Sequence, residues 1–144
     1  MGRLFPLAGL LRLRHLQQDR AATDLAAANK RLKENAERRT RARGALAGTA
    51  TDVANTAALR AAAAARASTR GMLADLEALA TERLRERDLA QSAFDTARTR
   101  SIGLEKLEDK HLHNLQAEEL RSEQKVLDEI ASVTWHRRQS EDTE

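Results

Sequence analysis

The histidines are the residues of this sequence whose side chains could most readily carry out chemistry. His111 and His113 are two positions apart, and side chains at that spacing on a helix do not face each other. His15 and His136 stand alone. A zinc site on a helix needs histidines four apart and a third ligand, and the chain has no cysteine to supply one. We therefore expect no metal site, and we interpret the histidines as solvated or seam-edge residues.

The sequence offers no other catalytic group. It has no glycine-rich phosphate loop and no nucleophile in a recognisable catalytic turn. Carboxylates such as Glu118 and Glu119 are expected on a polar helix face, where no burial would tune them for acid–base catalysis. The sequence thus predicts a protein that is not an enzyme and has no catalytic residue and no cofactor.

A basic stretch, residues 30–43, holds seven Lys or Arg against two Glu. Such a stretch could bind nucleic acid or an acidic protein, or it could be a solvated face that pairs with acids of the same chain. Nucleic-acid binding usually adds stacking aromatics or a known module, and aromatic residues make up 2% of this chain. We expect pairing within the chain, and no nucleic acid or small-molecule substrate.

The densest apolar cluster lies at the N-terminus and comprises Leu4, Phe5, Leu7, Leu10, Leu11 and Leu13. It could pack on the C-terminal end of a partner arm, insert into a membrane interface, or form a partner-binding tip. A secretory signal would show a small-residue cleavage site, and none follows. No apolar run approaches the ~20 residues that span a bilayer.

These residues must be positioned by helices, because the chain has one proline, six glycines and 33% charged residues. Proline and glycine punctuate turns, and Ala, Leu, Arg and Glu, which are frequent here, favour helix. Alanine buries little apolar area, so the sequence predicts an elongated molecule with a narrow seam.

A seven-residue repeat predicts a coiled coil. One seam position recurs from residue 11 to residue 60, and we expect the other position four residues after each. The first position gives Leu11, Gln18, Leu25, Leu32, Arg39, Leu46, Val53 and Arg60. A second stripe runs through the second half, with members such as Leu73, Leu76, Leu84, Phe94, Leu107, Leu115, Val126, Leu127, Ile130 and Val133.

The turn between the helices is predicted at residues 68–72, where Ser68, Thr69 and Gly71 could end one helix and cap the next. One hairpin, 1–144, then has arms 4–68 and 73–138 and a frayed tail 139–144. Gly44 and Gly48 form the competing break.

Charge favours folding back of one arm on the other. Residues 1–72 carry fourteen Lys or Arg against five Asp or Glu, whereas residues 73–144 carry eleven against seventeen. The net charges of +9 and −6 attract each other in an antiparallel pair. The predicted fold is therefore all-α, an antiparallel two-helix coiled-coil hairpin. The alternative is a longer continuous helix that dimerises.

Three stretches together resemble the FliJ family, the small coiled-coil component of the bacterial flagellar type III export apparatus. They are Phe5–Arg14, Leu104–Leu107 and Leu127–Ala131. The resemblance implies a hairpin similar to the central stalk of rotary ATPases. It also implies that the protein binds the hexameric flagellar export ATPase, the membrane-embedded export gate and some export chaperones. The location implied is the cytoplasm, at the inner face of the plasma membrane.

The resemblance further implies that the terminal ends of both helices face the ring pore. Partner-binding residues would be Phe5, Leu7, Leu10, Leu11, Arg12 and Arg14 on one arm, facing Leu127 and Ile130 on the other. The mechanism expected is that of a stiff asymmetric stalk, which contacts different ring subunits differently and couples hydrolysis to export.

Three other functions fit the same physical pattern. A stalk of a virulence-type injectisome needs the same properties, and genomic neighbours would distinguish it. A basic scaffold would bind DNA in a strongly salt-dependent way, which the acidic second arm disfavours. An export chaperone would form stable complexes with unfolded substrates and leave an ATPase unaffected.

Overall fold

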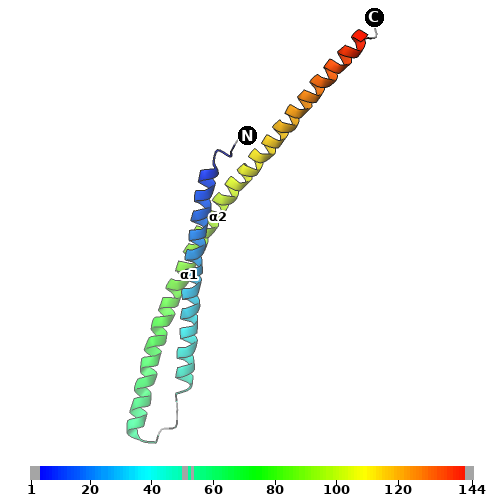
Figure 1. Ribbon diagram of the computed structural model, residues 1–144. Helices are drawn as coiled ribbons and strands as arrows, with labels where there is room; N and C mark the ends of the chain where they lie inside the picture. The colour runs from blue at the N-terminus through cyan, green and yellow to red at the C-terminus, as the bar shows by residue number, and fades with distance from the viewer. Residues whose placement is uncertain (1–3, 50–51, 53, 142–144) are drawn as a thin grey trace. The chain divides into compact units, whose positions relative to one another are not determined.

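The computed structural model describes residues 4–49, 52 and 54–141, which form two α-helices and no strand. Helix α1 is Ala8–Ala47 and helix α2 is Thr56–Glu141 (Figure 1). The two long helices pack against each other in opposite directions, so the predicted two-helix hairpin is confirmed. Neither helix, over the residues described, has a stretch long and apolar enough to cross a membrane.

Helix α1 begins just after the single proline. Pro6 has a fixed φ and no N–H, which suits a position ahead of the first turn. The Ala8 amide donates to the Phe5 carbonyl at 3.1 Å, and the Leu11 amide donates to the Leu7 carbonyl at 2.9 Å. At the other end, the Gly48 amide donates to the Gly44 carbonyl at 2.9 Å, which closes the last turn.

The predicted turn at residues 68–72 is wrong. Helix α2 runs through Ser68, Thr69 and Gly71 without interruption, and open space surrounds the position that a Gly71 side chain would take. One isolated glycine destabilises a helix by only about 1 kcal/mol relative to alanine, and the good helix formers on either side of it in a long helix compensate for this loss. The arms are therefore 40 and 86 residues long instead of nearly equal.

The chain instead reverses between α1 and α2, next to the competing glycines. Residues 48–55 combine glycine with Thr, Asp, Val and Asn, all weaker helix formers than Ala or Leu. Asn55 then caps α2, because its side-chain oxygen accepts a hydrogen bond from the Ala58 amide at 2.8 Å. Val53, which the sequence placed in the seam, lies outside the described residues. So do 142–144 of the predicted frayed tail, whereas 139–141 are helical.

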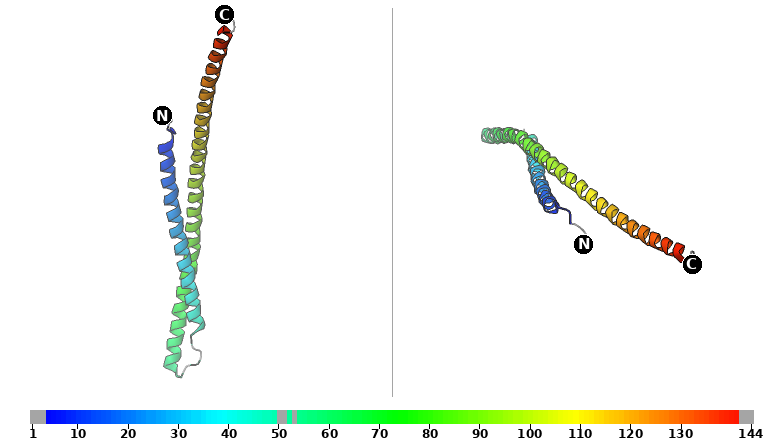
Figure 2. Two further views of the ribbon diagram at one scale, coloured as in Figure 1. Left: turned by 45° about the vertical axis from the view of Figure 1, so that its right-hand side comes forward. Right: turned by 90° about the horizontal axis from the view of Figure 1, so that it is seen from above.

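The chain divides into two compact units. One unit, residues 16–99, contains most of α1, the reversal and the first half of α2. In this unit the first turns of α2 extend beyond the end of α1 (Figure 2). The other unit joins residues 1–15 to residues 100–144.

The seam of the 16–99 unit follows a seven-residue repeat. The predicted first position is confirmed within α1, where Gln18, Leu25, Leu32, Arg39 and Leu46 are all half-buried. It is wrong at Arg60, which is exposed and belongs to α2. The second position was misplaced by one residue. It falls three residues after the first, at Ala21, Ala28, Asn35 and Ala42, and not four after it, at Ala22, Asn29, Ala36 and Arg43.

Helix α2 faces this seam with the predicted Leu73, Leu76 and Phe94, which are half-buried. Leu84, which was placed in the same stripe, is exposed, as is Leu107 in the other unit. Asn35 is 3% exposed and donates from its side-chain nitrogen to the Leu76 carbonyl at 3.1 Å. A buried asparagine in a coiled-coil seam favours one register over others.

Charges on the two arms pair across the seam as predicted. Arg31 of α1 bonds Glu86 of α2 at 3.2 Å, and Arg43 bonds Glu77 at 3.1 Å. Since exposed ion pairs contribute only ~0–1 kcal/mol each, they select the partner more than they stabilise the fold. Part of the basic stretch 30–43 therefore pairs within the chain, as expected.

Candidate partner-binding surface

The N-terminal cluster packs partly on α2. The Phe5 ring lies 5.7 Å from the His111 ring, centroid to centroid, and Leu11 is 6% exposed. His15 Nε2 lies 2.8 Å from a carboxylate oxygen of Glu105, which joins the two helices one turn further along. Part of the cluster thus packs against α2 and holds the start of α1 in place.

The remaining residues of the cluster face solvent. Leu4, Leu7, Leu10 and Leu13 are exposed. Arg12 is exposed as well, and Arg14 is half-buried. Of the six predicted residues on this arm, Leu7, Leu10 and Arg12 are therefore the most accessible to a partner.

The two predicted halves of the site do not face each other. Phe5 lies against His111, and Leu127 comes sixteen residues later on the same continuous helix. At 1.5 Å per residue, that separation is about 24 Å along α2. The expectation that the N-terminal residues face Leu127 and Ile130 is wrong because α1 is shorter than predicted and its start meets α2 near Glu105–His111.

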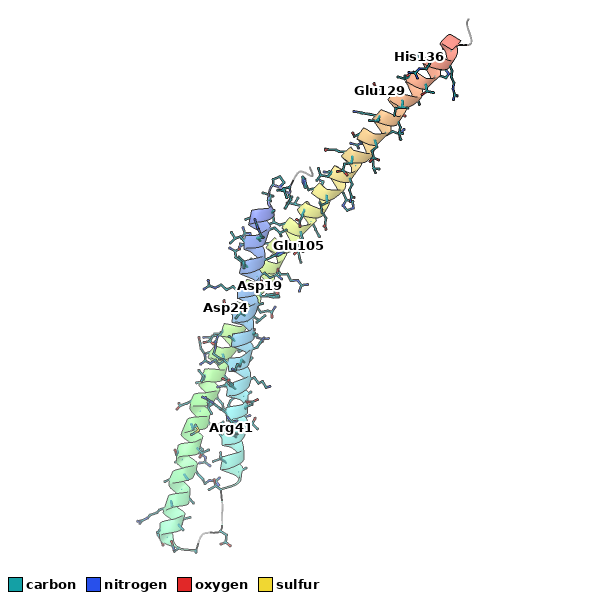
Figure 3. All side chains as sticks on the ribbon, in the orientation of Figure 1. Asp19, Asp24, Arg41, Glu105, Glu129 and His136 are labelled. Atoms are coloured by element: carbon teal, nitrogen blue, oxygen red, sulfur yellow. The ribbon has the colours of Figure 1, made fainter. Side chains whose placement is uncertain are left out.

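Beyond this contact, α2 has no covering segment within the described part of its unit. Every residue from Glu118 to Gln139 is exposed. Figure 3 shows Glu129 and His136 on this part of the helix, with no other ribbon beside it. We call residues 118–135 of this stretch the free segment.

The free segment carries an apolar stripe. Leu120 and Leu127 are seven residues apart, as are Val126 and Val133, and Ile130 lies between them. This spacing places the five side chains on one side of the helix, with Leu127 59% and Ile130 57% exposed. A shallow groove at its start is lined by Ser122, Glu123, Val126 and Leu127. We call Leu120, Val126, Leu127, Ile130 and Val133 the C-terminal stripe.

Hydrogen bonds within the helix support the free segment. The Gln124 side-chain amide donates to Asp128 at 2.9 Å, and the Thr134 hydroxyl donates to the Ile130 carbonyl at 2.8 Å. Trp135 packs edge-on against His136, with ring centroids 5.2 Å apart. These contacts are local, so they leave the C-terminal stripe available to another molecule.

A second groove lies between α1 and α2 near the reversal of the chain. It is lined by Arg38, Arg41, Ala42, Ala45, Thr69, Met72 and Leu76. Small alanines on α1 leave room there, and Met72 is exposed at its edge. Sequence reasoning missed this groove, because Thr69 and Met72 belonged to the predicted turn.

The charges on α2 next to the seam have one clear electrostatic consequence. Hydrogen bonds from Arg83, at 2.9 and 3.0 Å, hold the pKa of the Glu86 carboxyl below its usual value, with a further contribution from Arg31. In the part of the chain that the structure describes, no three His, Cys, Asp or Glu residues gather closely enough to hold a metal ion.

Comparison with known proteins gives one strong match. A protein-family model described as "Flagellar FliJ protein" matches residues 3–140. No curated protein and no solved structure matches the chain.

Proposed function

The chain belongs to the flagellar FliJ protein family and is a component of the flagellar protein export apparatus, and from this premise we propose that it binds the export ATPase ring as a stalk and links the ring to the export gate. The family consists of non-enzymatic components, so the protein would act through its contacts. The observation that carries the proposal is the free segment, a helix exposed on all sides with apolar residues along one of them.

A single helix is suited to entering a ring. With its side chains, an α-helix is about 10–12 Å wide, which is thinner than any pair of packed helices. The free segment of 18 residues, 118–135, would extend about 27 Å into a pore at 1.5 Å per residue. Leu7, Leu10 and Arg12, at the start of α1, would then contact the rim of the ring.

The asymmetry of the free segment supports a coupling role. One side carries the C-terminal stripe, whereas the opposite sides carry charged residues such as Arg121, Lys125 and Glu129. Ring subunits that face different sides would contact the helix differently, and differential contact is what biases one conformation over another. No catalytic residue of the stalk itself is required.

The other end of the hairpin would reach the export gate. The groove at Ala42, Ala45 and Met72 lies close to the reversal and offers apolar side chains flanked by Arg38 and Arg41. Apolar contact with a basic rim suits a protein surface that carries acidic residues around an apolar centre. This arrangement would place the protein at the cytoplasmic face of the membrane.

ATP hydrolysis by the export ATPase from the same genome tests the proposal. Titrating in this chain should give a saturable rise near one chain per ring. The double variant Leu127→Glu with Ile130→Glu should raise the half-saturating concentration by about tenfold or more, because it places two charges in an apolar contact.

Leu89→Glu is the matched control, since Leu89 is 72% exposed on α2 outside the free segment. It introduces the same chemistry and should leave stimulation unchanged. An unchanged hydrolysis rate with the wild-type chain, together with failure of the two proteins to co-elute, would discard the stalk function.

A further inference from the structure

The end of the hairpin at which the chain reverses is strongly basic. Residues 38–72 carry seven arginines and one acid, Asp52. Arg43 is paired with Glu77, and Arg39 is half-buried in the seam. The other five arginines make no ion pair with any residue that the structure describes. We call them the reversal arginines: Arg38, Arg41, Arg60, Arg66 and Arg70.

The reversal arginines come from both helices of the 16–99 unit. The groove that Arg38 and Arg41 line is also lined by Thr69 and Met72, so these two arginines of α1 lie beside the turn of α2 that holds Arg70. The first turns of α2, which include Arg60, extend beyond the end of α1 (Figure 2). Positive charge is therefore presented by two neighbouring helices at one end of the unit.

The arginines of α2 lack a counter-charge within their own stretch of helix. Arg66 and Arg70 are four residues apart, and like charges at this spacing destabilise a helix. The sequence has no acid between Asp52 and Asp75 to offset the repulsion. An anionic partner would supply the missing counter-charge.

The side chains around these arginines are small and apolar. Seven of the nine residues 57–65 are alanine, and the other two are Leu59 and Arg60. Leu59 is 56% exposed, and the spacing of four, three and four residues places Leu59, Ala63, Arg66 and Arg70 on one side of α2. Because alanine is short, the leucine and the two guanidinium groups project furthest from this side.

These features favour a lipid surface over an acidic protein or a nucleic acid. Residues 38–72 contain no aromatic residue. Protein hot spots usually combine arginine with Trp or Tyr, and single-stranded nucleic acids stack on aromatic rings. Clusters of about four to eight Lys or Arg bind anionic headgroups through charge alone. An apolar side chain on the same side of the helix can then enter the headgroup region.

We propose that the reversal arginines bind an anionic lipid surface, with the start of α2 lying on the headgroups and Leu59 entering between them. Each arginine close to such a surface strengthens binding by about fivefold, so a few together give a reversible, salt-sensitive attachment. Arg38 and Arg41 add to the same positive field. The gate contact proposed above is with a protein, and the lipid contact is additional to it.

Co-sedimentation of the full chain with lipid vesicles tests the proposal. The wild-type chain binds vesicles that contain phosphatidylglycerol, does not bind vesicles of phosphatidylcholine alone, and is released as the salt concentration rises. Arg60→Gln with Arg70→Gln lowers the partition coefficient by about tenfold or more. Circular dichroism verifies that the variant remains helical, since glutamine is a good helix former.

Arg20→Gln with Arg98→Gln is the matched control. Both arginines are exposed, lie outside residues 38–72 and form no ion pair within the described part of the chain. The two double variants have the same net charge, and the control keeps the wild-type partition coefficient. An equal loss of binding in both variants means that net charge alone drives adsorption, and it overturns the assignment to the reversal arginines.

Three further results overturn the proposal. One is the absence of binding to phosphatidylglycerol vesicles at low salt, and another is equal binding to both kinds of vesicle. The third is tighter binding to duplex DNA at the same phosphate concentration, lost in the Arg60 and Arg70 double variant, which assigns the arginines to nucleic acid. None of these results depends on the ATPase, so this proposal and the stalk function fail separately.

A fluorescent probe tests which side of α2 meets the lipid, since the natural chain has no cysteine. Ala63→Cys, labelled with an environment-sensitive dye, places the probe between Leu59 and Arg66 on the proposed side. Its emission shifts to shorter wavelength when phosphatidylglycerol vesicles are added. The same dye at Ala93→Cys, an exposed position further along α2, shows no shift. Equal shifts at the two positions contradict the proposed lipid-facing side.

Discussion

Glu86 is the point at which charges from both helices converge. It accepts hydrogen bonds from Arg83 on its own helix and from Arg31 on α1, and these bonds lower the pKa of its carboxyl group. A lowered pKa means that folding favours the ionised form. The stabilisation is therefore present at neutral pH and is lost as the pH falls through the lowered pKa of the folded state.

Replacing Glu86 by Gln should lower the thermal unfolding midpoint slightly at neutral pH, because the cross-arm bond to Arg31 is weakened. The difference between variant and wild type should shrink as the pH falls below the usual carboxyl range. Glu82→Gln is the control, since Glu82 pairs with Arg85 of the same helix, at 3.8 Å. A Glu86→Gln effect that is independent of pH would contradict the electrostatic explanation.

At the residue scale, half of the seam could be predicted from the sequence. The first seam position can be recognised because leucines, such as Leu25 and Leu32, recur at every seventh residue. The second seam position could not be placed, because alanines occur at both candidate spacings. Ala21 and Ala22 are equally apolar, so periodicity alone cannot choose between them. Asn35 was missed for a related reason, since a polar residue in a seam is recognised only once the register is known.

At the scale of the elements, the start of α2 depends on one side chain. Asn55 supplies the acceptor for the Ala58 amide, which would otherwise lack a helical partner. Asn55→Ala should therefore lower the free energy of unfolding by about 0.5–2 kcal/mol, as measured in urea. Asn55→Ser retains an acceptor and should recover most of the loss. Equal stability of the Ala and Ser variants would show that the cap contributes nothing.

The free segment should be dispensable for the packing of the hairpin. Removing residues 118–144 deletes no described contact between α1 and α2, so the thermal midpoint should change little. The helical signal should fall by about 24 residues, from 118 to the end of α2 at Glu141. Stimulation of the export ATPase should be lost. A midpoint lowered by more than about 4–8 °C would indicate a loss of roughly 1 kcal/mol and an undetected contact.

The type of each element could be predicted from the sequence, but the boundary between the helices could not. Helix-forming composition and the near absence of proline were sufficient for two helices. The position of the turn depended on comparing one glycine near residue 71 with a run of weak helix formers at 48–55. The run outweighs the single glycine because small propensities add over consecutive residues. Weighing the whole run and the capping asparagine would have identified the reversal.

At the scale of the whole molecule, the family and the hairpin were both predictable from the sequence, whereas the free segment was not. Charge asymmetry between the halves of the chain indicated two arms that attract each other, and Arg31–Glu86 and Arg43–Glu77 bear this out. The free segment follows from the unequal lengths of α1 and α2. It became visible only when the reversal was placed before residue 56, which leaves α1 too short to cover the rest of α2.

The position of Trp135 makes this protein its own optical reporter. It is the single tryptophan of a chain that contains no tyrosine, and it lies in the free segment with 57% of its surface exposed. Emission excited at the red edge of protein absorbance therefore comes from this one indole, beside the His136 ring. Any ring subunit that covers the neighbouring turns changes the solvent around the Trp135 indole. Binding of a partner to the free segment can thus be followed in the unlabelled, natural chain by the emission wavelength and anisotropy of its intrinsic tryptophan fluorescence.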